Sequence, residues 1–361
     1  MKKTPLHEYH KNLGAKLVDF AGFEMPIQYR SIIDEHLFVR KSCGVFDVSH
    51  MGEFIVTGKK AAEFLNRITI NDVTSLKIWQ AQYSAMCNED GGIIDDILIY
   101  RYPDHYMLVV NCSNIEKNFD WIVTHKPNDI FIANVSEKIG LIAVQGPKSL
   151  KILDKLVDID LNEMKYYHFS IATIKGSPAT ISRTGYTGEL GYEIYADNNS
   201  IIQIWNEIFK YPNNEILPAG LGCRDTLRLE MKYVLYGNDI DHKTNPIEAG
   251  LSWITKLNKE SFIGRESLEK YKNAQQRKLV CIEMIDKGIP RRGYEIFCDD
   301  EKVGSVTSGS QSPSLQKGIG LAYLNINKAN IDSELDILVR NKKLKCRVVK
   351  PPFYKNGSVL D

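Results

Sequence analysis

The last part of the chain, from Leu279 onward, is built of short apolar runs separated by glycine- and aspartate-containing turns. Almost no helical period interrupts it, which is typical of an all-β domain. A polar, charged stretch at 266–278 precedes it and is a candidate domain boundary. About eighty residues suffice for an independent β-barrel or sandwich. We therefore predict two parts, residues 1–276 and an all-β domain at 277–361.

The first part mixes strands and amphipathic helices, which favours the α+β class. Residues 106–111 and 140–145 are rich in β-branched and aromatic side chains and end at turn residues, so we expect strands there. Leucines at helical spacing after Gly146-Pro147 predict a helix. A second helix is predicted after residues 198–200, which are suitable N-cap residues. Its apolar stripe consists of Ile201, Ile204, Trp205, Ile208 and Phe209.

Charge and targeting signals exclude several function classes. The 46 basic and 45 acidic residues give a formal net charge of +1, so no global field attracts nucleic acid or a membrane surface. The N-terminus lacks an apolar signal segment, which predicts a cytoplasmic protein, or one of the mitochondrial matrix in a eukaryote. The seven cysteines are scattered and form no CxxC pair, so we expect reduced, mostly buried thiols.

Common catalytic motifs are missing from this sequence. It contains no Walker loop, no strand-bound GxGxxG, no HExxH and no GxSxG. His7 and His10 are a weak metal pair, and solvated positions on a first helix are the favoured interpretation, so no metal site is expected. Ser49 and His50 cannot act as nucleophile and base, because adjacent strand residues point to opposite faces.

The segment GGIIDDILIY, residues 91–100, places two carboxylates inside an apolar strand. A period of two puts Asp96 and Tyr100 on one face and Asp95 on the other, so the two carboxylates are no catalytic dyad. The segment alone favours a structural role for both, as acceptors of backbone N–H groups at a turn. The functional alternative is that one of them faces a site lined by Tyr100.

Two further glycine-containing blocks are candidates for ligand binding. In RTGYTGELGYEIY, 183–195, the spaced glycines allow either close approach to a flat ligand or a tight hairpin. Glu193 follows them in an apolar strand, where a ligand with N–H donors would satisfy it. In PAGLGCRDTLRLE, 218–230, Arg224 at a helix entry suits either a carboxylate or carbonyl partner or a surface ion pair.

A dozen blocks in series resemble the T-protein family of the glycine cleavage system, the tetrahydrofolate-dependent aminomethyltransferases. The resemblance runs from Thr4 essentially to the end of the chain. Its blocks are TPLHEYH, DFAGFEMPIQY, FDVSHM, GGIIDDILIY, LIAVQGP, TGYTGELGYEIY, CRDTLRLE, LYGNDID, FIGRE, GIPRRGYEI, GSVTSGSQSPSL and KPPFY. Where many members carry Ala-Gly after RLE, this chain has Met231-Lys232, which bears on local packing.

The resemblance implies a three-domain cloverleaf around a central folate channel. Residues 1–276 would form two interleaved α+β subdomains, one ferredoxin-like and one Greek-key, and 277–361 a C-terminal β-barrel. The implied reaction passes a carbon from the aminomethyl group on the lipoyl arm of H-protein to tetrahydrofolate, the co-substrate. The products are 5,10-methylenetetrahydrofolate, ammonia and the dihydrolipoyl arm. Lipoylated H-protein is thus the expected partner, and we expect the free protein to be a monomer.

The resemblance also implies roles for particular residues. Asp96 matches the essential catalytic aspartate near the folate nitrogens, whereas Asp95 would be structural. Glu193 matches the carboxylate that grips the pterin. Arg224 matches the folate-site arginine, which would face the pterin carbonyl, the glutamyl tail or Asp96. The other folate-lining positions are Met51, Tyr83, Tyr100, Asn111, Tyr186 and Tyr354, with Lys355 close by in the tail.

Two alternatives remain from the sequence. A related folate-dependent demethylase or methyltransferase would take its carbon from a small molecule and have nearly the same folate site. A non-catalytic folate-binding protein would carry a cysteine-containing KGCY block where this chain has 184–187, TGYT. Turnover with H-protein separates both alternatives from the main interpretation.

Overall fold

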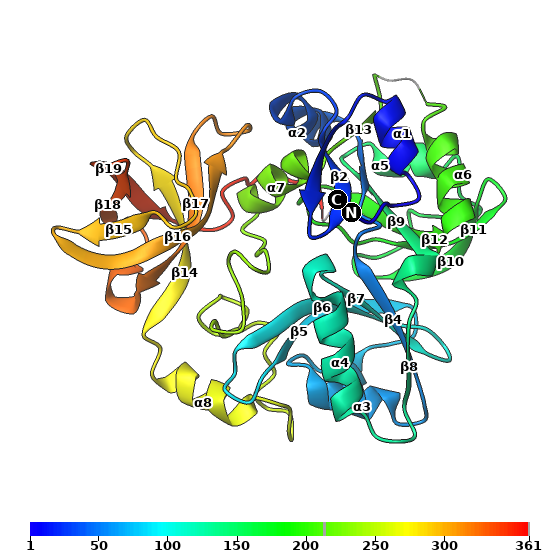
Figure 1. Cartoon of the computed structure of the whole chain (residues 1–361), viewed down its shortest axis with the longest axis horizontal. Coiled ribbons are helices and arrows are strands. Elements are labelled where there is room, and N and C mark those ends of the chain that lie inside the picture. The colour runs from blue at the N-terminus through cyan, green and yellow to red at the C-terminus, as the bar shows by residue number, and fades with distance from the viewer. Residues whose placement is uncertain (212–213, 360–361) are drawn as a thin grey trace.

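The computed structural model describes residues 1–211 and 214–359, which form three lobes (Figure 1). The β6 lobe contains a five-stranded sheet in the order β5-β6-β7-β4-β8, with two helices packed on it. Its strands are β4 (Gly52–Thr57), β5 (Gln80–Cys87), β6 (Ile93–Arg101), β7 (Tyr106–Val110) and β8 (Phe131–Asn134), and its helices α3 (Ala61–Ile68) and α4 (Ile115–His125).

The β12 lobe contains a six-stranded sheet in the order β10-β11-β12-β9-β3-β13. Its strands are β3 (Gly44–Asp47), β9 (Ile139–Gln145), β10 (Phe169–Ile174), β11 (Ser177–Ser182), β12 (Gly191–Asp197) and β13 (Leu217–Pro218). The helices around it are α1 (His7–Asn12), α2 (Ile32–Lys41), α5 (Ser149–Leu153), α6 (Asn198–Ile208) and α7 (Leu221–Glu230). A hairpin of β1 (Lys16–Phe20) and β2 (Phe23–Gln28) follows α1.

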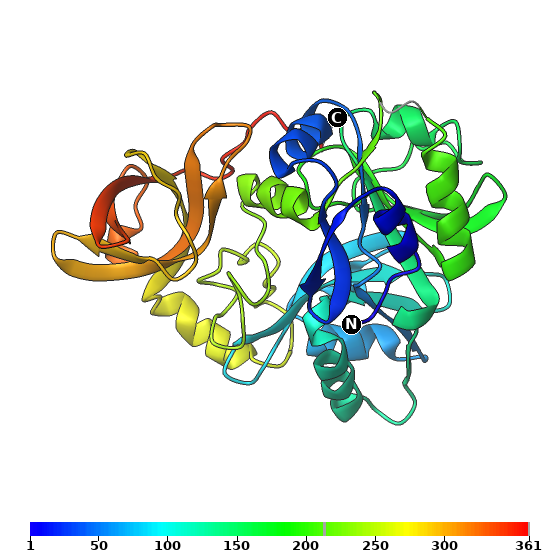
Figure 2. The same cartoon turned by 45° about the horizontal axis from the view of Figure 1, so that its top comes forward.

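The third lobe is a closed barrel in the order β14-β17-β16-β15-β18-β19, seen as a ring in Figure 2. Closure leaves no strand edge exposed. Its strands are β14 (Arg277–Met284), β15 (Glu295–Cys298), β16 (Glu301–Gln311), β17 (Gly318–Asn325), β18 (Glu334–Val339) and β19 (Lys342–Val349). Helix α8 (Arg265–Asn273) connects the barrel to the rest of the chain.

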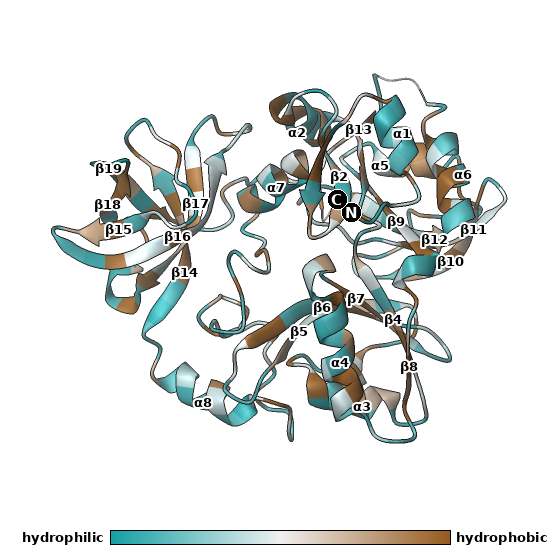
Figure 3. Cartoon of the chain, in the orientation of Figure 1, coloured by the Kyte–Doolittle hydropathy of each residue, from teal (hydrophilic) through white to brown (hydrophobic). Residues whose placement is uncertain are grey.

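The α+β class and the C-terminal barrel predicted from the sequence are confirmed. Strands β7 and β9 occupy the predicted positions. Apolar residues colour strands such as β7, whereas α1 is hydrophilic (Figure 3). All seven cysteines are free, five of them buried, as expected. None of the helices in the described residues is long and apolar enough to cross a membrane.

Several local predictions are wrong for physical reasons. Helix α6 buries the predicted stripe, but its N-cap is Asp197, whose carboxylate accepts from Asn199 N and Ser200 N, so the predicted cap residues lie inside the helix. Helix α5 is shorter than the leucine spacing suggested. His7 and His10 are buried rather than solvated, because each finds a distant carboxylate: His7 Nε2 lies 2.6 Å from Glu24 and His10 Nε2 2.8 Å from Asp47.

Candidate active site

The face of the β6-lobe sheet that meets the β12 lobe carries the predicted catalytic residue. Strands β6 and β7 are paired so that Leu98 lies opposite Val109. Asp96, two residues before Leu98, lies beside Asn111, two residues after Val109. The two sheets pack over a shared apolar core that contains Tyr100 of one and Tyr195 of the other. Their hydroxyls lie 2.9 Å apart, so this pair links the two lobes close to Asp96.

The Asp96 carboxylate has a hydrogen bond on each oxygen. Tyr83 Oη donates to Oδ2 at 2.9 Å, and Asn111 Nδ2 donates to Oδ1 at 2.8 Å. Burial raises the pKa of Asp96, and these two hydrogen bonds oppose that rise because they favour the charged form. The carboxylate is therefore held in one orientation in a low-dielectric setting.

Asp95 points to the opposite side of the sheet, as the strand period predicted. It is fully buried and accepts four hydrogen bonds, from Asn111 N, Asn111 Nδ2, Asn114 Nδ2 and Asn118 Nδ2. The interpretation of both carboxylates as acceptors of backbone N–H groups at a turn holds for one contact of Asp95, with Asn111 N. The other side-chain partners described above are amides of the asparagines and, for Asp96, the Tyr83 hydroxyl. The asparagine spacing in residues 111–118 was a signal for this cluster that sequence reasoning missed.

Glu193 lies on β12 and is buried. Thr184 Oγ1 donates to its Oε2 at 2.6 Å. Burial raises the pKa of Glu193, whereas the Thr184 hydrogen bond and the positive charge of Arg224 lower it. The hydroxyl of the fully buried Tyr100 lies 3.3 Å from Thr184 Oγ1, so Tyr100 contacts the same threonine that donates to Glu193.

Arg224 lies in the first turn of α7, partly buried, with its guanidinium 4.6 Å from the ring centroid of Tyr186. Its Nη1 is buried and has no hydrogen-bond partner among the described residues. Burial lowers the pKa of Arg224, and Glu193 is the carboxylate that opposes this. An unused donor on a desolvated cation is costly unless a ligand acceptor meets it. Arg224 is thus no surface ion pair.

The remaining predicted residues lie at the margins of this region. Met51 is partly buried against the core between the two sheets. Tyr186 stacks on Tyr233 with centroids 5.6 Å apart, and its hydroxyl donates to Val234 O. Tyr354 lies in the segment that returns from the barrel to the β12 lobe (Figure 2), where its N donates to Glu230 O at the end of α7 and the Arg40 guanidinium lies 4.1 Å from its ring centroid. Lys355 is exposed.

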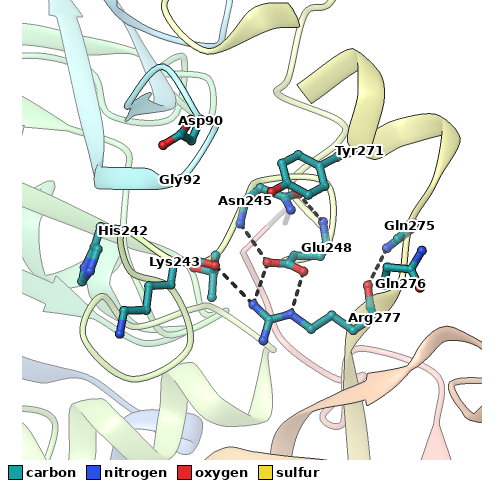
Figure 4. A pocket seen from close by; sticks show the side chains of 11 residues that line it. Asp90, Gly92, His242, Lys243, Asn245, Glu248, Tyr271, Gln275, Gln276 and Arg277 are labelled. Atoms are coloured by element: carbon teal, nitrogen blue, oxygen red, sulfur yellow. Dashed lines mark hydrogen bonds and ion pairs between the residues drawn. The ribbon is translucent and has the colours of Figure 1, made fainter. Parts of the chain in front are cut away.

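A separate pocket of about 340 Å³ lies between the β5–β6 turn, α8 and the start of the barrel (Figure 4). Arg277 binds Glu248 there through two hydrogen bonds of 2.8 and 3.0 Å, which tie β14 to the loop before α8. None of the predicted site residues lines it; the lining residues are Asp90, Gly92, His242, Lys243, Thr244, Asn245, Glu248, Tyr271, Gln275, Gln276 and Arg277.

Comparison with known proteins places this arrangement in one family. Residues 6–259 match the model of the GCVT N-terminal domain, and residues 277–355 that of the glycine cleavage T-protein C-terminal barrel domain. The chain is 50% identical over 356 residues to an aminomethyltransferase of Halothermothrix orenii, covering 98% of this chain and 100% of the relative. It is 51% identical over 362 residues to one of Chloroherpeton thalassium, covering 99% and 100%.

A crystal structure of glycine cleavage system aminomethyltransferase T from Bartonella henselae superposes with a TM-score of 0.92 at 30% identity, over 99% of both chains. The chain belongs to the glycine cleavage T-protein family. It is accordingly an aminomethyltransferase that uses tetrahydrofolate as co-substrate, and the family works with H-protein. The comparisons support this activity and not the alternatives of a small-molecule demethylase or a non-catalytic folate binder.

Proposed function

We propose that Asp96 is the catalytic carboxylate of the transfer from aminomethyl-dihydrolipoyl H-protein to tetrahydrofolate. In that reaction the carbon loses its bonds to nitrogen and sulfur and gains bonds to N5 and N10 of the folate. The two protons of those nitrogens leave with the departing groups, giving ammonia and the dihydrolipoyl thiol. As the first bond breaks, positive, iminium-like charge develops at the carbon, which a fixed carboxylate stabilises.

The observation that carries this proposal is the double anchoring of Asp96 by Tyr83 and Asn111. A carboxylate held by two donors needs no reorganisation when charge appears beside it, and the low dielectric strengthens the interaction. The raised pKa also suits a group that steers or relays a proton at the folate nitrogen.

The pterin end of the folate is assigned to Glu193 and Arg224. A carboxylate can accept the paired N–H donors of an aminopyrimidinone edge, and a guanidinium donor can meet its carbonyl. The free Nη1 of Arg224 and its electrostatic coupling to Glu193 support the pterin carbonyl as its target over Asp96 or the glutamyl tail. The lining residues Met51, Tyr83, Asn111 and Tyr186 are partly buried, as groups next to a ligand should be.

The wider assignments are proposals of the same kind. Lipoylated H-protein is the proposed partner, the free protein is proposed to be a cytoplasmic monomer, and neither nucleic acid nor membrane takes part. Tyr354 is proposed to reach the folate from the C-terminal tail. Residues 1–276 and 277–361 are proposed as the two structural parts, which agrees with the start of β14 at Arg277.

The test compares Asp96→Asn with the native chain, using aminomethylated H-protein and tetrahydrofolate and measuring methylenetetrahydrofolate and ammonia. We expect kcat to fall about 10²- to 10³-fold while folate binding persists. The matched control is Asp104→Asn, an exposed aspartate on the turn that follows β6, which should retain native turnover. Native-like kcat in Asp96→Asn would remove the proposed role.

A further inference from the structure

Trp253 is an exposed aromatic residue on the loop between α7 and α8, which lies at the centre of the three lobes (Figure 1). Its exposed fraction is 64%. The other tryptophans, Trp79, Trp121 and Trp205, are partly or fully buried. Tryptophan is among the residues most enriched where proteins bind partners, so an exposed indole that also contacts a candidate site is a candidate for ligand recognition.

The indole packs against Tyr83, one of the two residues that hold the Asp96 carboxylate. Its ring stacks on Tyr83, with centroids 6.2 Å apart and an interplanar angle of 27°. The Tyr83 hydroxyl in turn donates to Asp96 at 2.9 Å. One side chain, that of Tyr83, therefore connects the exposed Trp253 to Asp96.

The backbone around Trp253 is fastened to the β6 lobe, so the indole is presented in a fixed place. Ile254 is fully buried, and Lys256 N donates to Ile70 O at 2.9 Å. Lys259 Nζ donates to three backbone carbonyls, those of Asn66, Thr69 and Asn71, at 2.5, 2.6 and 2.8 Å. An ammonium held by three carbonyls anchors this loop close to the site.

We propose that the exposed face of Trp253 receives the aminomethyl-thioether end of the donor arm and guides it to Asp96. This end combines an ammonium group with a sulfur atom on a flexible aliphatic arm. An indole face attracts a cation electrostatically, and aromatic rings make favourable contacts with thioether sulfur. The inference rests on the proposed function of Asp96 and names the substrate end that approaches it.

The experiment measures steady-state kinetics of the full-length native chain, Trp253→Ala and Trp253→Phe. The donor is supplied in two forms, bound to H-protein and as free S-aminomethyl-dihydrolipoamide, and tetrahydrofolate binding is measured separately by calorimetry. We expect Trp253→Ala to raise KM about 3- to 30-fold for both donor forms, the range of one cation–π contact, with folate affinity unchanged. Trp253→Phe should recover most of the loss.

The control is Phe131→Ala, which removes an aromatic ring exposed at 69% on β8. It should leave both KM values at the native level. The inference is overturned if Trp253→Ala keeps the native donor KM, if only the H-protein-bound donor is affected, or if folate affinity falls instead, since the indole would then contact the protein partner or the folate ring. Absence of turnover in the native chain would instead refute the proposed function itself.

Discussion

Glu230, the last residue of α7, joins three parts of the chain through one fully buried carboxylate. It accepts hydrogen bonds from His36 and Arg40 of α2, at 3.1 and 2.8 Å. It also accepts from Ser312 Oγ at 2.5 Å and from both N and Oγ of Ser314, at 3.1 and 2.9 Å. The two serines follow β16, so Glu230 ties the barrel to the helices of the β12 lobe.

The contribution of these hydrogen bonds and ion pairs to the stability of the fold follows from the pKa of Glu230. Burial alone would raise that pKa, but His36, Arg40 and Ser312 favour the charged form and lower it from 4.5 to about 2. At about 1.4 kcal/mol per pKa unit, the folded environment stabilises the carboxylate by about 3 kcal/mol. Because the folded-state pKa is lowered, this stabilisation is present above pH 4.5 and is lost as the pH falls toward 2.

The substitution Glu230→Gln tests this contribution, because it keeps the shape of the side chain and removes its charge. We expect the free energy of unfolding in guanidinium at pH 7 to fall by about 3 kcal/mol relative to the native chain, and this difference to shrink by about 1 kcal/mol at pH 3.5. The control Glu334→Gln removes one partner of an exposed ion pair with Arg347 and should change stability by less than about 1 kcal/mol. A loss below about 1 kcal/mol at pH 7, or a loss independent of pH, would show that the charge of Glu230 does not supply this stability.

Three further predictions concern the site. Tyr83→Phe removes a hydrogen bond that lowers the pKa of Asp96, so the acidic limb of the kcat–pH profile should move up by about one pH unit; an unmoved limb would mean that Asp96 does not control it. Glu193→Gln should weaken tetrahydrofolate binding in calorimetry about 10-fold or more, and native affinity would exclude it from the pterin site. Lys259→Met leaves three carbonyls without their donor and should reduce unfolding free energy in chemical denaturation by about 2 kcal/mol or more; native stability would show that the loop is held otherwise.

Local periodicity predicted those features that depend on neighbouring residues. The alternation in β6 separated Asp95 from Asp96, and the turn-rich sequence after Leu279 indicated an all-β domain, which forms the closed barrel. Helix α8 was not predicted, because of its residues only Leu268 is buried and so its apolar stripe is almost absent. A nine-residue helix with one buried side chain leaves no apolar period in the sequence from which it could be predicted.

Features that depend on residues far apart in the chain could not be predicted from the sequence. The burial of His10 requires Asp47, thirty-seven residues away, and that of Arg224 requires the surroundings of Glu193 and Tyr186. The exposure of Trp253 is equally invisible locally, because Leu251 and Ile254 on either side are buried. Contacts of this kind arise from how the lobes meet, which no short spacing encodes.

The adjacent carboxylates of β6 are coupled through Asn111. A single amide, Asn111 Nδ2, donates to Asp95 Oδ1 and to Asp96 Oδ1, both at 2.8 Å, although the two side chains leave opposite faces of the strand. Asp95 accepts hydrogen bonds from Asn111, Asn114 and Asn118. It thereby holds in place the Asn111 amide, which orients Asp96. Burial, and after it the negative charge of Asp96, raise the pKa of Asp95, and the hydrogen bonds from the asparagine amides oppose that rise. The strand thus uses one buried carboxylate to position the other, which explains why both occupy a stretch that is otherwise apolar.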